Sequence, residues 1–83
     1  MNTRTTIDVT VSAFVDGLKT HQKAYQNAVA NGKDTTSTKQ DLEQLINVVD
    51  YYLENVRVPF SKDDPLKSLR RAKGQASHTL INN

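Results

Sequence analysis

Residues 38–56, TKQDLEQLINVVDYYLENV, constrain the fold of this chain more than any other stretch. Large apolar side chains recur there at alternating three- and four-residue steps, which places them on one stripe of an α-helix. The stripe consists of Leu42, Leu45, Val49, Tyr52 and Val56, and it is widened by Ile46 and Leu53. Val48 and Tyr51 extend the apolar surface onto flanks that a surface helix usually leaves polar. We therefore expect a helix that other segments must cover from more than one side.

The short length of the chain, 83 residues, makes stability a constraint. A domain of this size buries only about 60% of the surface that its unfolded chain exposes. Small domains usually gain a disulfide, a metal or a partner to become stable. The sequence has no cysteine, and its two histidines are far apart, so we expect neither a disulfide nor a metal or other cofactor. Association with another copy or another protein is therefore the remaining way to stabilise the domain.

No run of apolar residues approaches the ~20 that a membrane-spanning helix needs. The first residues also lack the apolar core of a secretory signal peptide. We therefore expect no membrane partner, and a location in the cytoplasm of the producing cell or in a virus particle.

A second helix is predicted at about residues 12–31, where apolar residues keep the same helical spacing. Ser12 is its expected N-cap, and Gly32 is suited to the left-handed conformation that ends helices. Ser37 and Gln40 match the capping box that opens a helix at about residues 38–56. Because the loop between the two helices is short, the sequence predicts an antiparallel helical hairpin.

The N-terminal arm, residues 1–11, has two interpretations. Ile7, Val9 and Val11 alternate with polar residues, as in a half-buried strand. Ile7 and Val11 also share a helical stripe with Phe14 and Leu18. The sequence leaves both open, and an extended arm would be a candidate contact with a neighbouring molecule.

After the hairpin, residues 57–64 are expected to form a linker in which Phe60 packs back on the helices. Asp64 followed by Pro65 indicates a helix start, with Asp64 as N-cap. We expect a short C-terminal helix at about residues 65–73, because Gly74 interrupts the pattern, and a basic tail to residue 83. The prediction is thus one small all-α domain.

Catalytic residues are not apparent in the sequence. Ser77 and His78 are adjacent, and adjacent helical residues do not face each other, so they make a poor nucleophile and base. Asp63 and Asp64 could contribute to a metal site, but helix capping explains them more simply. We therefore expect a protein that is not an enzyme.

Charged residues suggest where a partner could bind. An acidic stretch, 38–56, precedes a basic one, 57–83, so the two can pair within one chain or between chains. The candidate partner-binding residues are Lys19, Lys23, Asp50, Tyr51, Glu54, Lys67, Arg70, Arg71 and Lys73. The cluster from Lys67 to Lys73 could meet the phosphates of nucleic acid, but it lacks interleaved aromatic residues, so we favour a protein partner.

The expected function is that of a small helical subunit of a larger protein assembly, such as a structural accessory or connector protein of a phage-like virus particle. A small inhibitor or regulator that binds a host protein or nucleic acid through the basic C-terminal segment is the alternative.

Overall fold

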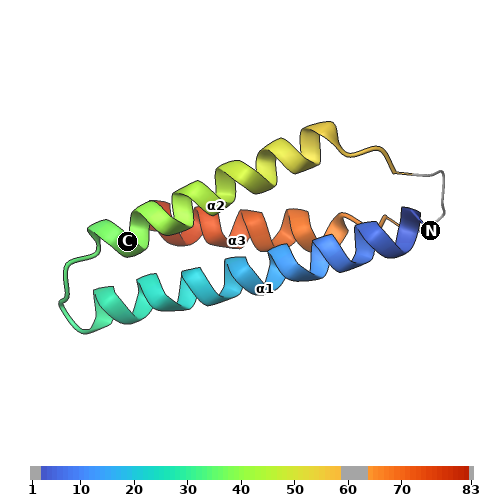
Figure 1. Ribbon diagram of the computed structural model, residues 1–83. Coiled ribbons are helices and arrows are strands. Elements are labelled where there is room, and N and C mark those ends of the chain that lie inside the picture. Colours follow the sequence, from blue (N-terminus) through green and yellow to red (C-terminus); the bar gives the residue numbers. More distant parts are fainter. Residues whose placement is uncertain (1–2, 59–63, 83) are drawn as a thin grey trace.

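The computed structural model describes residues 3–58 and 64–82, and these residues form three helices and no strand. The helices are α1 (Thr3–Ala30), α2 (Thr36–Asn55) and α3 (Lys67–Asn82). They lie side by side along a molecule of 46 × 21 × 17 Å, with α1 and α3 running in one direction and α2 in the other (Figure 1). The described part of the chain is therefore all-helical, as predicted, and the contacts between α1 and α2 are consistent with the predicted hairpin.

The core lies between the three helices, and each pair of helices is in contact. The buried apolar residues are Ile7, Val11, Leu18, Tyr25 and Ala28 from α1, Leu42, Ile46 and Val49 from α2, and Leu66, Leu69, Ala72 and Ala76 from α3 and the turn before it. Burial of such side chains contributes about 1.5–3 kcal/mol for each large one. Helix α1 provides most of the cover for α2, and α3 packs chiefly on α1 with a smaller contact to α2.

The strand interpretation of residues 5–11 is wrong, because α1 runs without interruption from Thr3. Ile7 and Val11 are buried, whereas Val9 between them is 65% exposed. Residues four apart share one helix face, whereas alternate residues of a strand would have shared one face of a sheet. Tertiary packing decides between the two, since Ile7 and Val11 belong to the core that the three helices share. Ser12, the expected N-cap, accordingly lies inside α1.

The loop between α1 and α2 begins as the sequence predicted and ends differently. Gly32 adopts φ 66°, and the Lys33 N–H donates to the Ala28 carbonyl at 2.9 Å. This is the hydrogen-bonding pattern of a glycine-terminated helix. At the start of α2, however, Asp34 Oδ1 accepts hydrogen bonds from the Thr36 N–H at 2.9 Å and the Thr36 hydroxyl at 2.7 Å. The capping box from Ser37 is therefore wrong, because α2 begins before that residue.

The C-terminal helix is longer than the predicted 65–73. It continues through Gly74 to Asn82 and buries Ala76 and Thr79. Gly74 is exposed, and a Cβ built on it would meet no atom within 4 Å. Tertiary contacts on both sides of Gly74 thus offset the ~1 kcal/mol that glycine costs inside a helix.

Residues 59–63 lie outside the described residues, and with them the predicted packing of Phe60 and much of the predicted linker. None of the helices that the structure describes is long and apolar enough to cross a membrane.

Candidate interaction surfaces

An apolar seam runs along the line where α1 meets α2. Leu45 of α2 lies so close to α1 that a Cβ on Gly17 would be 3.3 Å from its Cδ2 atom. The rings of Phe14 and Tyr52 pack at a centroid distance of 5.3 Å with an interplanar angle of 60°. Val48 lies three residues after Leu45 and four before Tyr52, so it lies on the same side of α2 as these two, at the flank of the main apolar stripe. We call Phe14, Leu45, Val48, Tyr52 and the neighbouring Tyr51 the apolar seam.

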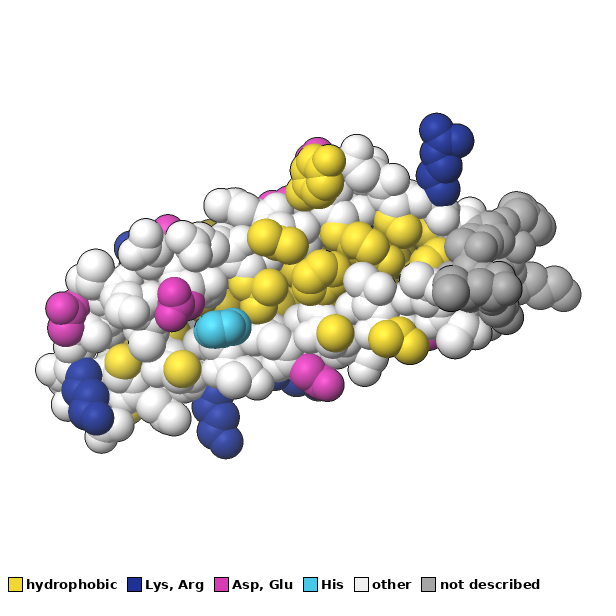
Figure 2. Space-filling model, in the orientation of Figure 1, with side chains coloured by type: hydrophobic (Ala, Val, Ile, Leu, Met, Phe, Trp, Pro, Cys, Tyr) yellow, Lys and Arg dark blue, Asp and Glu magenta, His cyan; other side chains and the backbone are white. Residues whose placement is uncertain are grey.

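The apolar seam is only partly covered within the chain. Phe14, Leu45 and Tyr52 are half-buried, and Val48 is 51% exposed. Tyr51, a predicted partner-binding residue, is 70% exposed beside Val48. Figure 2 shows a continuous band of hydrophobic side chains along one face of the molecule over α1 and α2, with most charged side chains at its periphery. The sequence indicated the α2 half of this surface, because Val48 and Tyr51 lie off the main stripe.

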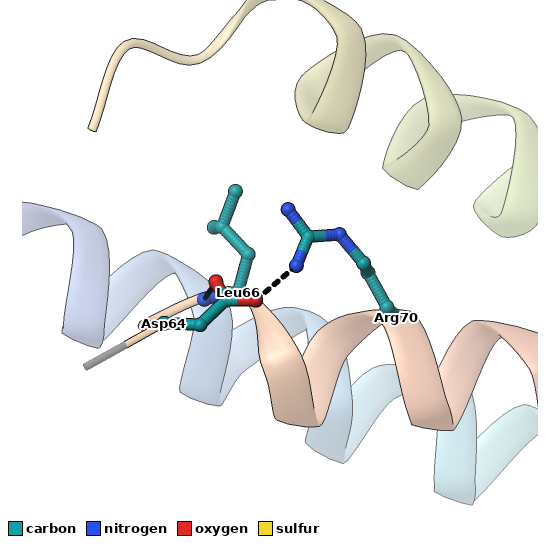
Figure 3. Close-up of polar contacts among 3 residues, drawn as sticks. All are labelled: Asp64, Leu66 and Arg70. Atoms are coloured by element: carbon teal, nitrogen blue, oxygen red, sulfur yellow. Dashed lines mark hydrogen bonds and ion pairs between the residues drawn. The ribbon is translucent and has the colours of Figure 1, made fainter. Parts of the chain in front are cut away.

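Arg70, a predicted partner-binding residue, forms an ion pair with Asp64 at the start of α3 (Figure 3). Asp64 Oδ1 also accepts a hydrogen bond from the Leu66 N–H at 3.0 Å. Asp64 therefore caps the turn that leads into α3, whereas the helix itself begins at Lys67 and not at the predicted Pro65. This backbone hydrogen bond is the largest cause that lowers the pKa of Asp64 from its usual value, followed by the contacts with Arg70 and the charge of Lys67. Much of the Arg70 charge is therefore balanced within the chain.

Lys73 and Asp50, two further predicted partner-binding residues, form an ion pair between α3 and α2. Both side chains are partly exposed, so the pair contributes little to stability. The pair nevertheless shows that part of the charge complementarity between the acidic and basic stretches operates within one chain. Glu54, one turn after Asp50 on α2, is exposed.

Lys19 of α1 and Arg71 of α3 line one surface cavity of about 250 Å³, although they are 52 positions apart in the sequence. Ser68 and Gln75 line the same cavity, with Val15 and Ala72. Sequence reasoning named Lys19 and Arg71 separately and missed that they meet, because no local pattern reports the contact between α1 and α3. It also missed Ser68 and Gln75, which carry no distinguishing signal.

The remaining two basic candidates extend this surface. Lys23 follows Lys19 by four residues on α1, and Lys67 precedes Arg71 by four residues on α3. Both are exposed. Residues four apart lie on the same side of a helix. We call Lys19, Lys23, Lys67 and Arg71 the basic edge.

In residues 3–58 and 64–82, no three histidine, cysteine or acidic side chains lie together as metal ligands would. Asp63 lies outside the described residues, so the pair with Asp64 is not described. Ser77 is half-buried on α3, and the ring of His78 forms a hydrogen bond with the side-chain amide of Asn82 at 2.8 Å.

Comparison with known proteins adds no further assignment. No protein-family model matches the sequence, and neither a curated protein nor a solved structure matches it. The function must therefore be argued from the apolar seam and the basic edge.

Proposed function

We propose that this protein is a non-enzymatic helical subunit that assembles with further copies of itself through the apolar seam. The observation that supports the proposal is the exposed apolar surface of α2, where Val48 and Tyr51 remain exposed although α1 and α3 both contact this helix. A contiguous apolar surface of this kind on a small protein is typical of an interaction site. A virus particle is the specific assembly that we propose, with this chain as an accessory or connector protein.

A second copy fits this surface better than an unrelated protein of marked charge. The band over α1 and α2 contains few charged side chains (Figure 2), so two copies can face each other there without opposing like charges. The exposed aromatic ring of Tyr51 is the kind of side chain that is enriched at the centre of interfaces.

Sedimentation velocity of the purified chain at micromolar concentration tests self-association. We expect a dimer or larger species, and we expect Val48→Glu with Tyr51→Ser to give a folded monomer. Both residues are exposed, so the substitutions remove little from the core. The matched control is Val9→Glu, which adds the same charge at an exposed valine of α1 away from the seam.

A monomer at these concentrations, or equal effects of the seam and control substitutions, would contradict the proposal. Mass spectrometry of purified particles from the producing cells tests the virus-particle part separately. If the chain self-associates but is absent from such particles, the proposed self-assembly stands and the proposed role in a virus particle is refuted.

A further inference from the structure

The cavity between α1 and α3 brings together groups that can bind a phosphate. Lys19 supplies an ammonium group, Arg71 a guanidinium, Ser68 a hydroxyl and Gln75 an amide, and all four residues line the cavity. Guanidinium and ammonium groups form strong, charge-assisted hydrogen bonds with phosphate oxygens. Among the described residues, no acidic side chain lines this cavity. Asp8 and Asp16 line an adjoining cavity, which limits the positive surface on that side.

The charges of the basic edge are largely free for a ligand. In the described residues the ion pairs involve Arg70 and Lys73, whereas Lys19, Lys23 and Arg71 form none. The charge of Lys67 attracts the carboxylate of Asp64 and helps to lower the pKa of that group. The fold therefore divides the basic cluster of the sequence into residues balanced within the chain and residues left for a partner.

The basic edge is elongated, which favours a linear polyanion over a single ion. Lys67 and Arg71 are one turn apart on α3, and Lys19 and Lys23 are one turn apart on α1. Four residues span about 6 Å along a helix. Because α1 and α3 run in the same direction (Figure 1), the charges follow one another along the molecule from Lys67 to Lys23.

The cavity itself is too small for a whole nucleotide to be enclosed. Its volume of about 250 Å³ is below the usual ~300–1,000 Å³ of small-molecule sites. None of the described residues that line it is aromatic, so they offer no ring on which a base could stack. Its apolar residues, Val15 and Ala72, are not exposed, so no apolar anchor for a lipid surface accompanies the charges.

We infer that the basic edge binds the phosphodiester backbone of nucleic acid, with one phosphate in the cavity between Lys19 and Arg71. The contacts are to phosphates, so binding is independent of base sequence. This surface is separate from the apolar seam, and the inference goes beyond the proposed self-assembly. Its failure leaves that proposal standing.

Fluorescence anisotropy of a labelled DNA duplex, at salt concentrations from about 50 to 200 mM, tests the inference. Three phosphate contacts predict a slope of about −2.7 in log affinity against log salt, which is a loss of roughly 40-fold over this range. The double variant Lys19→Gln with Arg71→Gln should retain its helicity by circular dichroism. It should reduce the slope by about 0.9, because it removes the one phosphate contact in the cavity and leaves those at Lys23 and Lys67.

The matched control is Arg70→Gln with Lys73→Gln, which removes the same formal charge from residues that are paired within the chain. We expect it to leave the slope unchanged. If this control variant loses helicity, a second control replaces it. The second control is Lys33→Gln with Lys39→Gln, which changes two exposed lysines near the loop between α1 and α2.

Three results would overturn the inference: no binding at the lowest salt, equal slopes for the two double variants, or binding to anionic phospholipid vesicles without binding to DNA. An equal loss in both variants would mean diffuse attraction by net charge, without a site at the cavity.

Discussion

Replacing Leu69 with alanine tests whether α3 is an integral part of the core. Leu69 is fully buried where α3 meets the rest of the molecule. Truncating a buried leucine removes its transfer free energy and leaves a cavity, which together cost about 2–5 kcal/mol. A domain of this size has a total stability on the order of 5–10 kcal/mol, so the loss is a large fraction of it.

For a domain of 60–100 residues, 1 kcal/mol corresponds to about 4–8 °C in melting temperature. A cost of about 3 kcal/mol therefore predicts that Leu69→Ala melts roughly 12–24 °C below the unsubstituted chain. Circular dichroism melts at one fixed protein concentration measure this, since association would otherwise shift the transition.

Ile81→Ala is the matched control, because Ile81 lies on the same helix and is 82% exposed. Its expected effect is within about 0.5 kcal/mol. If Leu69→Ala melts within a degree or two of Ile81→Ala, α3 does not pack as described, and the juxtaposition of Lys19 with Arg71 is wrong as well.

Three further predictions concern the backbone and the caps. Gly74→Ala should stabilise the chain by about 0.5–1 kcal/mol, because Gly74 is exposed in a helix interior and its Cβ would meet no neighbour; the check is a higher melting temperature. Gly32→Ala should instead lower the melting temperature by a cost of about 1–2 kcal/mol, since φ is 66° there. An equal effect of the two substitutions would refute both. The pKa values of Asp34 and Asp64 lie below the usual 3.8, chiefly because hydrogen bonds from Thr36 and Leu66 favour the charged carboxylates. The charged carboxylates therefore stabilise the folded chain above pH 3.8, and this stabilisation is lost as pH falls through the lowered pKa values. Asp64→Asn should therefore destabilise the chain at pH 7, and melts repeated at lower pH should show the difference from the unsubstituted chain narrowing; a constant difference would contradict this.

The sequence by itself determined the features that depend on local spacing and local backbone chemistry. The stripe of Leu42 and Val49 specified α2, and Gly32 specified where α1 ends, because only a residue tolerant of positive φ suits that position. Asp64 specified the cap before α3 for the same kind of reason, since its carboxylate reaches a backbone N–H two residues away.

Tertiary structure decided between conformations that local sequence patterns allow equally. Ile7 and Val11 fit a strand or a helix by local spacing, and their burial in the shared core selects the helix. Gly74 lowers the local helix propensity, but α3 continues through it because Ala76 and Thr79 beyond it are buried. The candidate site shows the same division. The sequence supplied Lys19 and Arg71 as charges, but only the packing of α1 against α3 brings them to one cavity, and only the ion pairs with Asp50 and Asp64 remove Lys73 and Arg70 from it. Contacts between residues distant in sequence depend on how whole helices pack, and no short-range spacing encodes that.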